Sequence, residues 1–137
     1  MPTPLDIIVF RKPQCFFSKL LALAPKYDAG LYLSIDGPAR SPINVIASID
    51  TDGIFKITCE AAQFRQQVKG EEIFRIRLES GVDHAQRAIR QVLGASSWRG
   101  EKLTGAKAVA YIFGHDDWAS ATVDTLLSKR IQYASDN

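Results

Sequence analysis

A thiol is the first group in the chain that could do chemistry, in the run Arg11-Lys-Pro-Gln-Cys-Phe-Phe-Ser18. Cys15 and Ser18 form a CxxS motif between an expected strand and an expected helix. Backbone N–H groups and the dipole at a helix start lower the pKa of a thiol, and Lys12 and Lys19 would add to that effect. Cys15 is therefore a candidate nucleophile, and the alternative is a small apolar cysteine on a helix.

The stretch from Ile7 to Leu21 resembles the thiol motif of the glutaredoxin and thioredoxin group, in which a buried strand leads into a cysteine at a helix start. The resemblance implies that Cys15 is the nucleophile and that Ser18 replaces the resolving cysteine. Ser41-Pro42 is similar to the proline that precedes the third strand in those folds. The sequence departs from those folds in one respect, since the helix expected between the second and third strands is missing from the pattern. The resemblance makes a thiol-redox protein one alternative function.

A group of basic and aromatic residues in the second half of the chain could bind anions. Its members are Arg75 and Arg77 on one strand face, Arg87 and Arg90 one helical turn apart, and Trp98, Arg99 and Lys102 in the following loop. Presented together, the cations would hold phosphates while the indole stacks on a base, which predicts a nucleic-acid interface. The alternative is a set of solvated faces whose field is cancelled by the nearby glutamates Glu71, Glu72, Glu79 and Glu101.

The sequence Gly114-His-Asp-Asp-Trp118 follows the last expected strand, a position where α/β proteins often place ligands or catalytic groups. His115 with Asp116 and Asp117 could carry out acid/base chemistry or bind a metal. The only other histidine is His84, and no HxH or HExxH spacing occurs, so we predict no metal and no cofactor. The alternative role of Asp116 or Asp117 is to cap a helix.

Other enzyme signatures are absent from the sequence. There is no GxxxxGK(S/T), no GxGxxG after a strand and no GxSxG elbow. A non-enzymatic role is therefore favoured over an enzymatic one.

Composition indicates one ordinary cytoplasmic domain over residues 1–137. Hydrophobic residues make up 46% of the chain and the formal net charge is +2, so a core can form and bulk charge selects no partner. Two cysteines, Cys15 and Cys59, are too few for a disulfide scaffold. The most apolar segment, Cys15–Pro25, is about half the roughly 20 residues that span a bilayer, so we expect no membrane contact.

Hydrophobic periodicity predicts the order strand, helix, four strands, helix, strand, helix. The expected strands are Leu5–Phe10, Gly30–Gly37, Ile43–Ile49, Ile54–Cys59, Glu72–Glu79 and Ala106–Phe113. The expected helices are Gln14–Lys26, a segment from Asp83 to Gly94 with a capping box at Asp83 and Gln86, and a last helix capped by Asp116 or Asp117 with Val123, Leu126, Leu127 and Ile131 inward. Asp50–Gly53 is a hairpin loop, Ala61–Lys69 is a short helix or an irregular crossover, and the tail from Ala134 is expected to fray.

These elements predict an α/β (α+β) domain with a mixed β-sheet of about six strands and three helices packed on it. Without a strong chemical constellation, the favoured function is a small binding or regulatory module acting on a protein partner, of the inhibitor, immunity or accessory type. Such a module would use exposed aromatic and arginine anchors. The aromatics available for this purpose are Tyr27, Tyr32, Trp98, Trp118 and Tyr133. A nucleic-acid-binding accessory protein using the cluster from Arg75 to Lys102 is the other alternative.

Overall fold

The computed structural model describes residues 4–11, 27–37, 41–67 and 70–131. The strands are β1 (Ile7–Arg11), β2 (Tyr27–Asp36), β3 (Pro42–Ile49), β4 (Phe55–Glu60), β5 (Gly70–Ile76), β6 (Ser97–Trp98), β7 (Glu101–Lys102) and β8 (Arg130–Ile131). The helices are α2 (Ala61–Gln67), α3 (Gly81–Val92), α4 (Gly105–Ile112), the 3-10 helix η2 (Trp118–Ser120) and α5 (Val123–Ser128). The expected helix Gln14–Lys26 and the tail from Ala134 lie outside the described residues.

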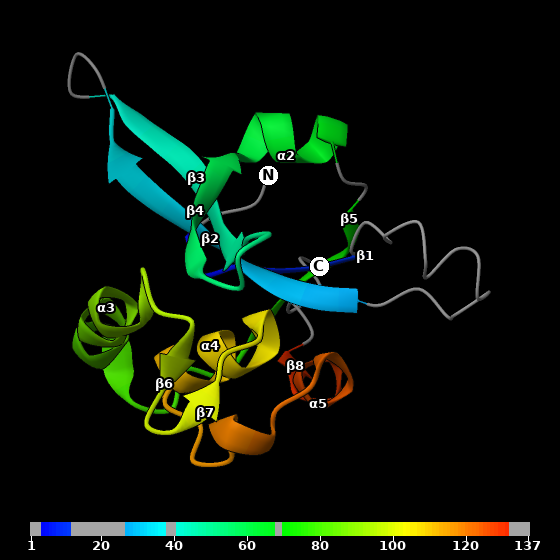
Figure 1. Ribbon diagram of the computed structural model, residues 1–137. Coiled ribbons are helices and arrows are strands. Elements are labelled where there is room, and N and C mark those ends of the chain that lie inside the picture. Colours follow the sequence, from blue (N-terminus) through cyan, green and yellow to red (C-terminus); the bar gives the residue numbers. More distant parts are fainter. Residues whose placement is uncertain (1–3, 12–26, 38–40, 68–69, 132–137) are drawn as a thin grey trace, which may run out of the picture.

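The main sheet has six strands in the order β4-β3-β2-β1-β5-β8, and β6 and β7 form a separate small hairpin (Figure 1). The predicted α+β class and the number of strands in the main sheet are confirmed. Its described pairs are all antiparallel, whereas a mixed sheet was expected. Only a few residues separate β2 from β3 and β3 from β4, and connections this short make antiparallel neighbours.

The predicted strand Ala106–Phe113 is wrong, because this segment forms α4. Periodicity cannot distinguish a short, fully buried helix from a buried strand, and α4 is buried almost all round. Its alanines favour the helix, and Thr104 caps it by accepting a hydrogen bond from the backbone N–H of Lys107 at 3.1 Å. The sixth strand of the sheet is instead β8, which pairs with β5.

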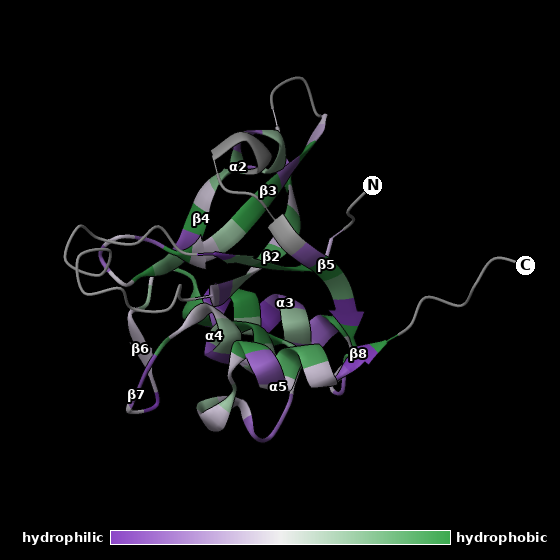
Figure 2. Cartoon of the chain, turned by 90° about the vertical axis from the view of Figure 1, so that its right-hand side faces the viewer, coloured by the Kyte–Doolittle hydropathy of each residue, from purple (hydrophilic) through white to green (hydrophobic). Residues whose placement is uncertain are grey.

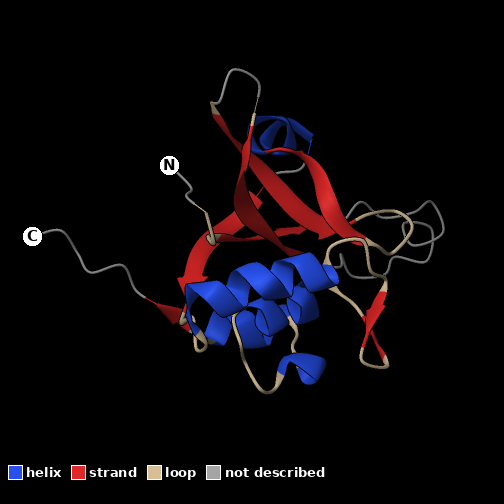
Figure 3. Cartoon of the chain, turned by 90° about the vertical axis from the view of Figure 1, so that its left-hand side faces the viewer, coloured by secondary structure: helices blue, strands red, loops and turns tan. Residues whose placement is uncertain are grey.

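Helices cover both faces of the sheet, but unequally. α3, α4 and α5 form a layer on one face, and the short α2 lies on the other (Figure 3). Alternation along β1 serves both layers, since Ile7 and Val9 join the large core while Ile8 and Phe10 join the small core around Phe64. Hydrophilic and hydrophobic residues alternate along the helical layer, as expected for helices with one buried side (Figure 2).

Several local predictions are confirmed. The hairpin loop Asp50–Gly53 is present with Gly53 at φ +80°, and Gly94 at φ +86° follows α3. Ala61–Gln67 resolves as the short helix α2. Arg75 and Arg77 are exposed as expected.

The predicted helix caps are wrong. α3 begins at Gly81, and its N-cap Ser80 makes no side-chain cap hydrogen bond, so no capping box forms at Asp83. Thr122 caps α5 in a reciprocal capping box with Thr125, and neither Asp116 nor Asp117 does so. A threonine at this position satisfies the first free amides of α5, so the aspartates are left for other contacts. Ile131, expected to point inward, is exposed in β8.

No helix in the described ranges is both long enough and apolar enough to span a membrane.

Candidate functional site

The thiol candidates are only partly within the structure. Cys15 and Ser18 lie outside the described residues. Cys59 is half-buried on β4, and burial raises the pKa of its thiol despite a hydrogen bond with Thr58 that acts in the opposite direction. A raised pKa keeps Cys59 protonated and unreactive at neutral pH.

His115 is buried and both of its ring nitrogens are engaged. Lys129 Nζ donates to His115 Nδ1 at 2.9 Å, so the ring proton sits on Nε2, which donates to the Arg77 carbonyl oxygen at 2.8 Å. The imidazole therefore ties the end of α4 to the segment after β5 and to the chain just beyond α5. Both ring nitrogens are thus occupied by contacts within the chain.

The two aspartates beside His115 also differ in role. Asp117 accepts both hydrogen bonds that Lys129 Nζ directs at its carboxylate, at 2.9 and 3.0 Å, and this contact lowers the pKa of Asp117. Asp116 is exposed. Within the described ranges, no group of three or more His, Cys, Asp and Glu side chains is placed to hold a metal.

The predicted basic cluster is divided by ion pairs. Arg75 pairs with the buried Asp6, and Arg77 Nε lies 3.8 Å from Glu79 Oε2. Other lysines and arginines are paired in the same way. These further pairs are Lys56–Asp50, Lys107–Glu101, Lys129–Asp117 and Arg130–Glu72.

Within the described ranges, the cations on α3 and the β6–β7 hairpin are not paired in this way. Arg87, Arg90, Arg99 and Lys102 form no ion pair with any residue that the structure describes, and all are exposed. The uncompensated positive charge of the predicted cluster is thus concentrated in this part of the surface.

Arg99 occupies the turn of the β6–β7 hairpin. Trp98 pairs with Glu101, and the two residues between them, Arg99 and Gly100, have φ values of +49° and +81°. Two successive positive φ values are typical of a type I′ turn, in which asparagine and glycine are the preferred residues. An arginine at the first of these positions is strained, and strain of this kind is enriched at functional sites.

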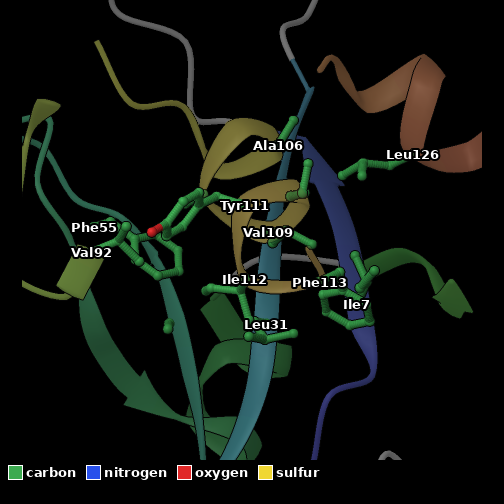
Figure 4. Packing of buried hydrophobic residues seen from close by; sticks show 14 of the residues in the cluster. Ile7, Leu31, Phe55, Val92, Ala106, Val109, Tyr111, Ile112, Phe113 and Leu126 are labelled. Atoms are coloured by element: carbon green, nitrogen blue, oxygen red, sulfur yellow. The ribbon is translucent and has the colours of Figure 1, made fainter. Parts of the chain in front are cut away.

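Tyr111 on α4 is the centre of an aromatic cluster against this hairpin. Its ring centroid lies 5.8 Å from that of Trp98, 5.3 Å from that of Trp118 and 6.3 Å from that of His84. Its hydroxyl donates to Gln91 Oε1 at 2.8 Å. The side chain leaves α4 on the side of Phe55 and Val92, away from Leu126 (Figure 4). Tyr111 therefore joins α3, the hairpin and η2.

The Arg99 guanidinium lies over this cluster. Its Cζ is 5.4 Å from the ring centroid of Tyr111 and 5.8 Å from that of Trp98, distances suited to cation–π attraction. The Trp98 Nε1–H beneath is buried and has no hydrogen-bond partner in the described part of the molecule. A buried donor without a partner destabilises the fold. The hairpin therefore has two adjacent destabilising features, the Trp98 Nε1–H without a described partner and the strained backbone of Arg99.

Arg87 lies on the same flank of α3 as the residues that contact Tyr111. His84, Arg87 and Gln91 are spaced i, i+3 and i+7, so they form one ridge on the helix surface. Arg90 is about 100° around the helix from Gln91. Lys102 pairs with Ser97 and so lies on the opposite face of the hairpin from Trp98.

We use the name aromatic–arginine patch for the side chains gathered around Tyr111. Its members are His84, Arg87, Gln91, Trp98, Arg99, Tyr111 and Trp118. Of these residues, Arg87, Trp98 and Arg99 were predicted from the sequence as binding residues and Trp118 as an aromatic anchor, whereas His84, Gln91 and Tyr111 were not predicted. The signal for them is available only once residues 105–112 are read as a helix, because a strand would have placed Tyr111 in the sheet.

The remaining aromatic candidates lie elsewhere. Tyr32 is 1% exposed in the small core, and Tyr133 lies outside the described residues. Tyr27 is 42% exposed and contributes to a cavity of about 490 Å³ between the sheet and α5, together with Val9 and Leu127. Glu72, a carboxylate of this cavity, is already paired with Arg130.

Comparisons with protein-family models, curated proteins and solved structures gave no match to this chain. The geometry of the patch is therefore the basis for the function proposed below.

Proposed function

We propose that this chain is a small binding module that acts on a protein partner and that the aromatic–arginine patch is the contact surface. The observation that carries the proposal is the position of Arg99, whose guanidinium lies over Tyr111 and Trp98 without pairing to a described carboxylate. Tryptophan, tyrosine and arginine are the residue types enriched among binding hot spots. An inhibitor, immunity or accessory protein would act through such a surface.

The two destabilising features of the hairpin, the strained backbone of Arg99 and the Trp98 Nε1–H without a described partner, support a binding role over a purely structural one. Stability alone would favour asparagine at position 99 and a partner for the Trp98 Nε1–H. The partly exposed indoles of Trp98 and Trp118 flank the guanidinium and offer apolar area around it. A surface with a central arginine and a surround of aromatic rings can exclude water when a partner covers it.

The test is affinity capture with cross-linking from the native host, comparing two double variants that remove the same charge. Arg87→Gln with Arg99→Asn alters the patch, and Arg90→Gln with Lys102→Gln removes two unpaired cations outside it, one about 100° around α3 from Gln91 and one on the opposite face of the hairpin from Trp98. We expect the wild type and the second variant to retain the same protein, and the first variant to lose it.

Each other outcome of the capture has a definite meaning. Equal loss by both double variants would indicate attraction by overall charge and would contradict a specific patch. Retention that disappears after nuclease treatment would favour the nucleic-acid alternative. If the wild type retains no protein above the level of an unrelated domain of similar size, the proposal is wrong.

A further inference from the structure

We propose that the aromatic–arginine patch recognises an acidic peptide segment of the partner, with a side-chain carboxylate bound by Arg99 and a neighbouring apolar side chain packed on the indoles. This inference rests on the proposed function and adds the chemistry of the partner. Two features of the surface, its charge and its donors, lead to it.

The positive charge of the patch is not compensated by any described residue, whereas Arg75 and Arg77 of the predicted cluster are paired. Arg75, Arg77 and Arg130 each have a carboxylate partner within the chain. Arg87 and Arg99 form no ion pair in the described ranges. A protein partner that presents a carboxylate here would supply the missing charge, as complementary interfaces do.

Acidic residues in the part of the chain that the structure describes do not fill this role. Glu101, across the hairpin from Trp98, is held by Lys107 Nζ at 3.5 Å. Asp83 is exposed on α3 and forms no ion pair with Arg87 among the described residues, although the two are spaced i, i+4. The guanidinium groups of the patch therefore keep their charge available to a partner.

The N–H groups of the Arg99 guanidinium are also available to bind a carboxylate. The guanidinium contacts the rings of Tyr111 and Trp98 and donates no hydrogen bond to a described residue. A guanidinium has five N–H donors in a planar fork that matches a carboxylate with two parallel hydrogen bonds. Because the rings already restrict the side chain, less conformational freedom is lost when the carboxylate binds.

The small number of unpaired cations within the patch favours a peptide carboxylate over a nucleic acid. A nucleic-acid interface neutralises several phosphates, and its affinity follows the number of cations that do so. Only Arg87 and Arg99 belong to the patch, and Arg75 and Arg77 are paired with acids of the chain. Aromatic rings beside two arginines suit a short segment in which an acidic residue adjoins an aromatic or aliphatic one.

The inference is tested by selecting binders from a displayed library of random peptides with the full-length protein. We expect the enriched peptides to carry aspartate or glutamate next to an aromatic or aliphatic residue. The most enriched peptide is then synthesised together with a copy in which each acidic residue is replaced by its amide. We expect the amide copy to bind the wild type about tenfold more weakly, in line with loss of a charge-assisted hydrogen bond.

Variants locate the carboxylate. Arg99→Asn is expected to weaken the acidic peptide about tenfold and to leave the amide copy almost unchanged, so the two losses are not additive. Arg90→Gln with Lys102→Gln is expected to change either affinity by about twofold or less. Circular dichroism of each variant shows whether it is folded.

Failure of the inference is distinguishable from failure of the proposed function. Enriched peptides that are neutral or basic, or an amide copy that binds as tightly as the acid, overturn the inference while the captured partner can still depend on the patch. No enriched peptide at all also overturns it. A random single-stranded oligonucleotide that binds more tightly than the acidic peptide and loses affinity with Arg99→Asn would assign the surface to nucleic acid instead.

Discussion

Asp28, buried at the start of β2, accepts a hydrogen bond from the backbone N–H of Gly105, the first residue of α4, at 3.2 Å. The same carboxylate accepts from Ala106 N at 3.3 Å and from Ala29 N at 2.9 Å. A strand residue thus satisfies the free amides at the start of a helix that comes much later in the chain, and its charge suits the helix dipole. This contact fixes the position of α4 and therefore of Tyr111.

Removing the Asp28 carboxylate should be strongly destabilising. We expect Asp28→Ala to lower the free energy of unfolding by at least about 2 kcal/mol, because buried amides lose a charged acceptor. Urea denaturation measures the change. Asp36→Ala, on an exposed position of the same strand, is the control and is expected to stay within about 0.5 kcal/mol of wild type. Similar values for the two variants would show that Asp28 does not anchor α4.

Gly105 should tolerate no side chain. A Cβ at this position would lie 1.9 Å from the Ala29 carbonyl oxygen and 2.6 Å from Asp28 Oδ1, so α4 would have to move away from β2. We expect Gly105→Ala to cost about 3 kcal/mol or more, as overpacking against backbone does. Gly30→Ala is the comparison, because its nearest contact would be the Ala47 carbonyl oxygen at 3.1 Å. Thermal denaturation should rank Gly105→Ala as the less stable variant, and the reverse order would contradict this packing.

The contacts of His115 predict its tautomer. With Lys129 Nζ donating to Nδ1, the neutral ring must carry its proton on Nε2, where it donates to Arg77. Nitrogen-15 chemical shifts of the imidazole should report this tautomer in the wild type at neutral pH. Lys129→Met should shift the Nδ1 signal, whereas Lys107→Met, which removes a different ion pair, should leave it in place. A proton found on Nδ1 in the wild type would contradict the arrangement.

Two carboxylates predict how stability changes in acid. A hydrogen bond from Lys129 lowers the pKa of Asp117. The pKa of Asp50 is lowered mainly by the hydrogen bond from the backbone N–H of Ile54 and, to a smaller extent, by the hydrogen bond from Lys56. A carboxyl group whose folded pKa lies below its unfolded pKa stabilises the fold above the unfolded value, and this contribution is lost as the pH falls through the folded value. We therefore expect the stability of the wild type to fall below about pH 4.

The matching variant is Asp50→Asn with Asp117→Asn. It should be less stable than wild type at neutral pH, and the difference should shrink as the pH is lowered below about 4, because the variant has no such carboxylates to protonate. Urea denaturation across the pH range measures both curves. Parallel curves would show that these ion pairs contribute nothing to the acid transition.

Predictions from the sequence succeeded where the signals are local. The loop Asp50–Gly53 is held by Asp50 Oδ1, which accepts from the backbone N–H groups of Asp52 and Ile54 at 2.9 Å, and those residues are neighbours in the chain. The buried stripe of α3 follows from helical spacing in the same way. The strand prediction for Ala106–Phe113 failed because the surroundings of α4, including the distant Asp28, decide its conformation more than its own hydrophobic pattern does.

In the candidate site, too, residue types could be predicted from the sequence but contacts between distant segments could not. Trp98 and Arg99 could be named from residue type, but their meeting with Tyr111 depends on how α4 packs beside α3 and the hairpin. The ion pair of Arg75 with Asp6 was hidden because it joins positions far apart in sequence, whereas Glu79, which pairs with Arg77, was among the glutamates expected to compensate the cluster. Which cations remain unpaired is a property of the folded surface, so the sequence alone could not restrict the cluster to the patch.

Arg99→Asn is expected to separate binding from stability. Asparagine followed by glycine is the preferred pair for a type I′ turn, so the substitution relieves strain at φ +49° while it removes the guanidinium from Tyr111 and Trp98. Relief of about 1 kcal/mol and loss of about 0.5–1 kcal/mol of cation–π attraction nearly offset each other. The free energy of unfolding should therefore remain within about 1 kcal/mol of wild type, measured by urea denaturation.

Partner binding should nevertheless be lost in Arg99→Asn. Arg99→Val is the control for the turn, because a β-branched residue at positive φ should destabilise the hairpin and the protein while removing the same charge. If Arg99→Asn unfolds as readily as Arg99→Val, the guanidinium mainly stabilises the aromatic cluster. If Arg99→Asn is stable and still retains the partner, the contact surface lies away from the patch. A stable variant that no longer binds would place Arg99 at the interface, where its strained backbone is maintained for recognition rather than for folding.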